Sequence, residues 1–215
     1  VGRGSRRWTI VGAFAVASVI LAGHTQIVIY VLYVGLAYAI TTGIMERQGR
    51  PFAIRIATMF VLGGLLTAYK SIPLAEASRY VARQEVSYGQ FTSHGNTPVE
   101  MLSALFPNLL HDGREAPTYV GIATLALVIV PITRRARDWR ISFWLCVAVL
   151  GLFLGMGDAT PVTRVAYWVP LYDKFRVVSR HLMFTGFGAA ALAGFAIAAI
   201  QRGEVSRADA RRAAG

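Results

Sequence analysis

The chain has 215 residues, of which 55% are hydrophobic and 15% are charged, and its mean hydropathy is +0.50. So few polar side chains cannot cover a water-soluble globule of this size, which argues against an ordinary soluble domain. The net charge of +11 does not indicate a nucleic-acid partner, because the cations fall in short clusters between apolar runs. The single cysteine, Cys146, excludes a disulfide framework or a cysteine metal site within the chain.

Six apolar segments follow one another and predict an all-α, polytopic transmembrane helical bundle. The predicted spans are roughly 8–22, 27–45, 54–69, 119–132, 141–156 and 182–200. Several are shorter than the roughly 20 residues that cross a bilayer, and flanking Trp, Tyr, Lys and Arg side chains would snorkel to supply the missing length. An alternative for the first segment is a signal peptide behind the basic N-terminus.

Three local features shape this bundle. The polar turn GHTQ after Ala22 makes a hairpin of the first two spans. Lys70 and Pro73 are expected to end the third span, because proline lacks a backbone donor. Gly151 and Gly155 form a GxxxG pattern compatible with close helix packing, but in a chain with 21 glycines the pattern is too common to carry weight.

The two long polar loops, 70–117 and 157–181, are predicted to contain short interfacial helices. The spacing from Leu74 to Val86 suggests an amphipathic helix. Thr97-Pro98-Val99-Glu100 has the form of a capping box with proline at the first helical position, and Thr160-Pro161 has a similar start. The apolar sides of such helices would lie at the membrane surface.

The distribution of cations predicts the orientation. The N-terminus, the two short loops and the tail together carry fourteen cations, whereas the two long loops carry eight cations against seven acids. Positively charged segments stay in the cytoplasm, so both ends of the chain are predicted to be cytoplasmic and both long loops to face outward. We therefore expect a transmembrane region over 1–203 and a basic cytoplasmic tail over 204–215.

Polar residues in the outer loops are the candidate ligand-binding residues. His24 and Gln26 lie at an outer membrane edge, where they could contact a lipid-linked phosphate or sugar, and the alternative is that they form a capped hairpin turn. Arg79 and Arg83, four residues apart, could clamp an anion, unless they pair with Glu76 and Glu85 as ordinary surface ions.

The densest outward cationic group follows Trp168 and precedes the last span. It consists of Lys174, Arg176, Arg180 and His181, partly offset by Asp173. Arginine forks suit phosphate or pyrophosphate, and the alternative role is anchoring to anionic headgroups. The acids that could act as a base or hold a divalent ion are scattered singly, which favours solvated loop residues: Glu100, Asp112, Glu115 and Asp158.

Five stretches, taken in order, resemble the YfhO-type family of bacterial polytopic membrane proteins, which are related to GT-C glycosyltransferases. They are AGHTQIVIY, LLTAYKSIPLAEASR, LFPNLL, YVGIATLAL and LGMGDATPVTRVAYWVPLYDKFRVVSRHL, and together they are spread over most of the chain. One departure is Val178, where the family's pattern has proline.

The resemblance implies an enzyme of the bacterial cytoplasmic membrane that transfers a sugar from a polyprenyl-phosphate carrier to a cell-envelope polymer or glycolipid on the outer face. It implies that Arg176 and Arg180 help to bind the carrier phosphate, with His24 and His181 nearby. The catalytic carboxylate of such enzymes lies in an earlier outer loop that no residue here matches, so the chain is expected to be a piece of a longer protein. No cofactor is identified, and a divalent metal would belong to the parent protein.

Two other classes of function stay open. A lipid or solute transporter or flippase usually has ionisable residues within its spans or broken helices, and here the charges fall at the span edges. A non-catalytic membrane scaffold would use the outer loops to bind a partner protein.

Overall fold

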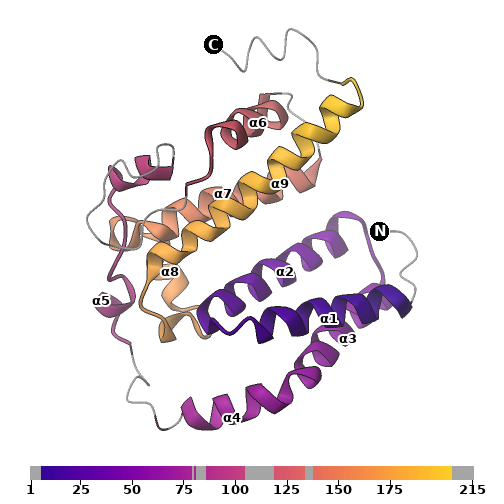
Figure 1. Cartoon of the computed structure of the whole chain (residues 1–215), viewed down its shortest axis with the longest axis vertical. Helices are drawn as coiled ribbons and strands as arrows, with labels where there is room; N and C mark the ends of the chain where they lie inside the picture. Colours follow the sequence, from indigo (N-terminus) through magenta and orange to yellow (C-terminus); the bar gives the residue numbers. More distant parts are fainter. Residues whose placement is uncertain (1–5, 79, 81–85, 105–118, 134–137, 205–215) are drawn as a thin grey trace. The chain divides into compact units, whose positions relative to one another are not determined.

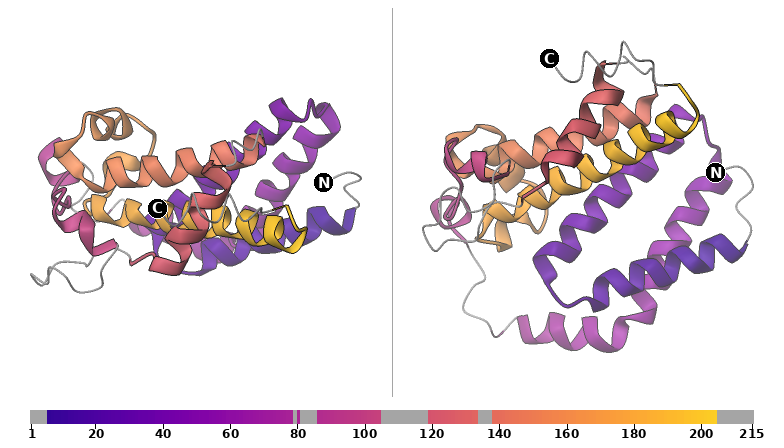
Figure 2. Two further views of the ribbon diagram at one scale, coloured as in Figure 1. Left: turned by 90° about the horizontal axis from the view of Figure 1, so that it is seen from above. Right: turned by 45° about the horizontal axis from the view of Figure 1, so that its top comes forward.

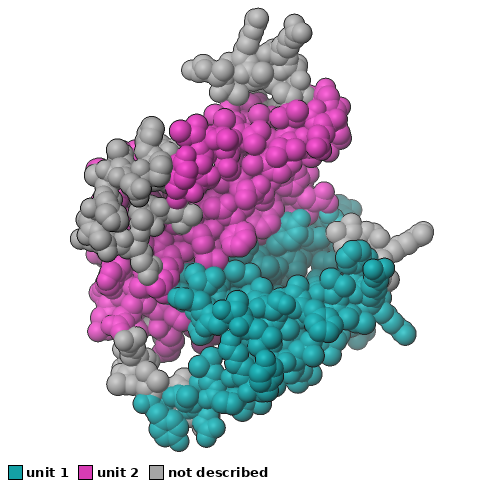
Figure 3. All heavy atoms as spheres, viewed as in Figure 1, with its two compact units in different colours: residues 1–85 teal, residues 86–215 magenta. Residues whose placement is uncertain are grey.

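The computed structural model describes residues 6–78, 80, 86–104, 119–133 and 138–204, and within these ranges every regular element is a helix. Contacts divide the chain into two compact units, residues 1–85 and 86–215, shown in separate colours in Figure 3. The all-α prediction is therefore confirmed for the described residues.

Unit 1 consists of α1 (Arg6–Leu21), α2 (Thr25–Met45), α3 (Arg50–Leu66) and α4 (Ala68–Ser78), drawn in indigo to magenta in Figure 1. Small residues let α1 and α3 approach closely, since Ala13 and Ala17 are buried and a Cβ on Gly63 would lie 2.9 Å from the Ala13 carbonyl oxygen. The α1–α2 turn is the predicted hairpin: Gly23 takes a left-handed φ of +96° and His24 caps α2.

The predicted end of the third span at Lys70 and Pro73 is wrong. Helix α3 stops at Leu66, the chain bends by 72°, and Pro73 lies inside α4. The break falls at Thr67, which is fully buried and whose hydroxyl donates to the carbonyls of Gly63 and Gly64. The Thr67 amide also donates to the Gly64 carbonyl, so the last turn of α3 is tightened by a bond between residues three apart. Lys70 has a different task, because its ammonium donates to the Ile20 and Leu21 carbonyls at the end of α1.

Unit 2 is built around the antiparallel pair α7 (Trp139–Gly155) and α9 (Leu182–Gln201), against which α6 (Ile122–Thr133) also packs (Figures 1 and 2). Short elements precede α6 and connect α7 to α9. They are α5 (Tyr88–Phe91), η1 (Glu100–Ala104), η2 (Gly157–Ala159), α8 (Val162–Tyr167), η3 (Tyr172–Lys174) and η4 (Val178–His181).

Glycines set the distance between α7 and α9. A Cβ on Gly188 would lie 2.6 Å from both the Ala148 methyl and the Trp144 carbonyl oxygen, and one on Gly151 would lie 2.7 Å from the Thr185 amide nitrogen. The Thr185 hydroxyl donates to the Ala148 carbonyl across the same contact. The GxxxG pattern set aside in the sequence therefore marks a real helix–helix contact, of the kind that small residues make in membranes.

Helices occupy all six predicted segments, but the count of about six spans is not confirmed. Among the described residues, only α2 and the continuous stretch Val178–Gln201 are long and apolar enough to cross a membrane, and the bent pair α3–α4 would be a third. Helices α1, α6 and α7 have 16, 12 and 17 residues, fewer than the roughly 20 that a full crossing needs.

The α7–α9 contact predicts opposite effects of the same substitution at two glycines of one helix. Gly188→Ala inserts a methyl group where no space exists and should cost about 1–3 kcal/mol. Gly194→Ala, with no heavy atom near its Cβ, should stabilise by up to about 1 kcal/mol because alanine favours helix. Unfolding by sodium dodecyl sulfate in detergent micelles measures both free energies, and equal effects would contradict the close contact.

Candidate functional site

Residues 86–104 and 156–181 of unit 2 form a folded cap beside the shared end of α7 and α9. Two hydrogen bonds tie its two segments together: the Ser93 hydroxyl donates to the Arg176 carbonyl (3.2 Å), and the Tyr167 hydroxyl donates to the Val86 carbonyl (2.7 Å). The Asn96 amide ties the first segment to the end of α7 by donating to the Gly155 carbonyl (2.9 Å). The two predicted outer loops of the sequence thus meet in one structure, since these bonds join positions up to 83 residues apart.

Buried threonines hold the centre of the cap. The Thr163 hydroxyl donates to the Gly157 carbonyl (2.6 Å), and the Thr160 hydroxyl donates to the Phe153 carbonyl (2.7 Å). Gly157 has a φ of +61°, and a Cβ there would lie 3.1 Å from the Gly95 α-carbon. Glycine is required at position 157 because a side chain would strain the left-handed backbone and would also crowd the backbone of Gly95.

Both predicted helix starts in the cap are present. Thr97 and Glu100 make the reciprocal bonds of a capping box, although the helix that follows, η1, is a 3-10 helix. Pro161 precedes α8 as predicted. Ser87 and Gln90 form a second capping box at α5, which the S-x-x-Q spacing of the sequence signals and the sequence analysis missed.

Charged and aromatic side chains gather around Tyr88. The Arg164 guanidinium lies 5.9 Å from the centre of the Tyr88 ring, and the Tyr167 ring meets it edge-on at 5.6 Å. The Tyr88 hydroxyl oxygen is enclosed and makes no hydrogen bond among the described residues, with Asp158 and Arg164 as its charged neighbours. Burial first, and then Asp158, raises the pKa of Tyr88, while Arg164 opposes the shift.

The four residues of the predicted cationic group take different positions in the cap. Lys174 is exposed, and Arg176 and Arg180 are half-buried. His181 is fully buried: its ring lies between Tyr172 and Phe184, at centroid distances of 5.5 and 5.8 Å, and its Nδ1 is 2.7 Å from the Val178 carbonyl oxygen. In this conformation His181 is a core residue that presents no surface to a ligand.

The candidates of unit 1 have structural tasks. His24 is exposed and its Nδ1 accepts from the Ile27 amide at 3.5 Å, which is the capped-turn alternative. Gln26 is buried and donates to the Tyr30 hydroxyl (2.9 Å), inside unit 1 rather than toward a ligand. The predicted anion clamp of Arg79 and Arg83 lies outside the described residues, as do Asp112 and Glu115.

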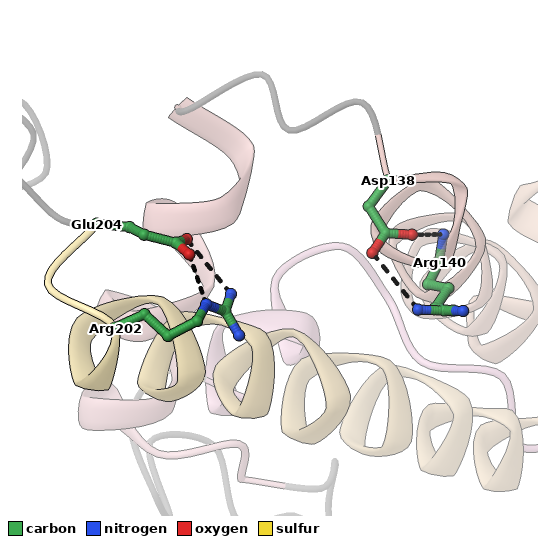
Figure 4. Close-up of polar contacts among 4 residues, drawn as sticks. All are labelled: Asp138, Arg140, Arg202 and Glu204. Carbon is green, nitrogen blue, oxygen red and sulfur yellow. Dashed lines mark hydrogen bonds and ion pairs between the residues drawn. The ribbon is translucent and has the colours of Figure 1, made fainter. Parts of the chain in front are cut away.

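The opposite end of unit 2 carries charges of the predicted cytoplasmic side (Figure 4). Asp138 caps α7 by accepting from the Arg140 amide, and Arg202 pairs with Glu204 just after α9. Asp138 and Arg202 also border a pocket of about 190 Å³. Solvent-exposed pairs of this kind contribute little to stability, so this end offers no built site.

Metal chemistry has no site in the part of the chain that the structure describes, because no group of three His, Cys, Asp or Glu side chains comes together there. A scan of protein-family models, a search of curated proteins and a search of solved structures each found no match to this chain. The resemblance to the YfhO-type family therefore stays a prediction.

The raised pKa of Tyr88 makes a pH-dependent contribution to stability. A tyrosine in the unfolded chain ionises near pH 10, whereas in the native state Tyr88 keeps its proton to higher pH. Its contribution is complete below about pH 10 and is lost as the pH rises through the native pKa.

Two substitutions should move that pKa in opposite directions. Asp158→Asn removes a cause of the increase and lowers the pKa of Tyr88, whereas Arg164→Gln removes the opposing cation and raises it. NMR titration of ring-labelled tyrosine measures both, with Tyr88→Phe to assign the signal. Shifts in the same direction would show that the two charges do not act on the Tyr88 hydroxyl.

Proposed function

We propose that the chain is part of a membrane glycosyltransferase-like protein that transfers a sugar from a polyprenyl-phosphate carrier to a cell-envelope polymer or glycolipid on the outer face of the bacterial cytoplasmic membrane. The resemblance supplies the reaction class. The structural observation that supports it is the folded cap, which presents Arg176 and Arg180 next to the first turn of α9.

The position of these arginines suits a lipid phosphate. Helix α9 has 20 residues, about 30 Å of helix, which matches the hydrocarbon thickness of a bilayer. If α9 crosses the membrane, a cation just before Leu182 lies at headgroup level, where the phosphate of a polyprenyl carrier also lies. Guanidinium groups there can stabilise the departing phosphate without burying a charge in hydrocarbon.

The cap also offers groups for a hydroxylated acceptor. The Asp158 carboxylate is exposed on the cap, and the half-buried rings of Tyr88 and Tyr167, which meet edge-on, lie beside it. Carboxylates position or deprotonate acceptor hydroxyls in general base catalysis. In this proposal Asp158 orients the acceptor, and the catalytic carboxylate belongs to the parent protein.

We propose for the topology that all six apolar segments cross, with both ends of the chain in the cytoplasm and the cap outside. The edge of α8 would then rest in the membrane interface, since Val165, Trp168 and Leu171 are 70%, 85% and 53% exposed. Leu171 is held outward at a φ of +68°, the position of a tight turn closed by the Tyr172 amide and the Val169 carbonyl. Tryptophan is typical of this boundary.

A chain with Trp168 as its sole tryptophan tests that placement. In vesicles, the emission of Trp168 should be shifted to the blue and quenched about twofold by lipids brominated near the glycerol end of the acyl chain, because interfacial rings lie at that depth. The control replaces Val165 and Leu171 with serine, which should restore a water-exposed spectrum. If iodide fully quenches the emission of Trp168 while Val165 and Leu171 are intact, α8 does not lie in the membrane interface.

Replacing the arginines tests the activity. In proteoliposomes of the intact protein supplied with polyprenyl-phosphate sugars, Arg176→Ala with Arg180→Ala should lower the release of carrier phosphate about a hundredfold or more, by analogy with loss of an anion-stabilising donor. Arg6→Ala with Arg7→Ala removes the same charge from the predicted cytoplasmic side and should leave release unchanged. Equal effects of the two pairs would overturn the assignment of the phosphate site.

A second candidate function is transport, favoured by the 72° bend between α3 and α4. Discontinuous helices are typical of transporters, and the helix is interrupted at Thr67, between α3 and α4. Uptake of a labelled lipid-linked sugar into vesicles without release of carrier phosphate would favour this reading over sugar transfer.

A further inference from the structure

An open apolar groove of about 660 Å³ lies between α2 and α3 in unit 1. Helix α3 packs mainly against α1 and touches α2 little, so α2 and α3 separate from the turn that joins them (Figure 2). The volume is within the range of pockets that hold small ligands. The groove is therefore a feature of the helix arrangement within one unit.

Small residues create the space, and large apolar ones border it. Ala39 and Gly43 of α2 face Ala53 and Ala57 of α3, and a Cβ on Gly43 would lie 3.5 Å from the Phe52 ring. On the α2 side Ile40 and Ile44 are 54% and 69% exposed. An exposed apolar surface of this extent marks a binding site, and the apolar side chains that line the groove exclude a polar occupant.

The turn that joins α2 to α3, from which Gln48 lines the groove, is basic. Gln48 donates to the Glu46 carboxylate, and the exposed Arg47 and Arg50 stand on either side of Gln48 and Gly49 in the chain. Arg47 has a φ of +50°, a conformation that non-glycine residues seldom adopt. An apolar groove beside a turn that carries two arginines against one carboxylate fits an amphiphile with an anionic head.

We infer that the α2–α3 groove binds an anionic phospholipid, with an acyl chain between the helices and the phosphate at Arg47 and Arg50. The inference does not depend on the proposed sugar transfer, because it concerns unit 1 and the membrane leaflet at the α2–α3 turn. Since α2 is long and apolar enough to cross a bilayer, lipid acyl chains are available at the groove.

The test measures lipid that stays with the full chain. The protein is extracted from vesicles of equal parts phosphatidylglycerol and phosphatidylethanolamine, washed in detergent, and analysed by native mass spectrometry. The unaltered chain should retain about one phosphatidylglycerol, in line with a single pocket of this size. Gly43→Leu fills the groove and should abolish retention.

Two further variants separate filling of the groove from general effects. Gly35→Leu places the same side chain on the same helix where no heavy atom lies near the Cβ, and it should retain lipid as before. Arg47→Gln with Arg50→Gln should keep one lipid but lose the preference for phosphatidylglycerol over phosphatidylethanolamine.

Three results would overturn the inference. They are equal retention by the Gly43→Leu and Gly35→Leu chains, an unchanged headgroup preference after loss of both arginines, and a chain that retains no lipid while Gly43→Leu alters its oligomeric state. The last result would mean that protein, either a second copy or another part of the chain, covers the groove. Circular dichroism of each variant checks that the helices are intact.

Discussion

The close contact of α7 with α9 is the constraint on which unit 2 depends. Gly151 and Gly188 bring the two backbones so near that no side chain fits between them at these positions. In a bilayer, apolar side chains gain nothing by leaving lipid, so helices associate through close van der Waals contact and interhelical hydrogen bonds. The Thr185 hydroxyl adds such a bond at the same place.

The cap follows from that contact. The end of α7 lies beside the start of α9, so the 26 residues between them must fold over that end of the pair. Residues 86–104 bind at the same end. Its interior contains polar residues: Thr160, Thr163 and Asn96 are buried, and their side chains donate to the carbonyls of Phe153, Gly157 and Gly155. A buried polar centre of this kind specifies one arrangement, since each unpaired group would carry a desolvation cost.

In unit 1 the helices also pack closely through small residues, but fewer helix pairs share extensive contact. Gly63 and Ala13 bring α3 onto α1, Thr67 ends α3, and the Lys70 ammonium caps α1 by reaching its last carbonyls. A cation at a helix C-terminus opposes the negative end of the helix dipole. Helix α2 shares little of this contact, which leaves the groove beside α3 uncovered within the unit.

The order of apolar and polar segments determined the helical class and the position of every long helix to within a few residues, because both depend on local periodicity. It also determined the GHTQ turn and the capping box at Thr97, because their side chains bond within one helical turn. The span count did not follow, since the hydropathy pattern does not decide whether helices as short as α6, with 12 residues, cross a membrane. Only the tertiary structure placed His181 in the core, gave Lys70 its partner 49 residues away, and brought Tyr88 next to Asp158 and Arg164. Those outcomes depend on which segments far apart in the sequence pack against each other, and the spacing of residues along the chain does not determine that.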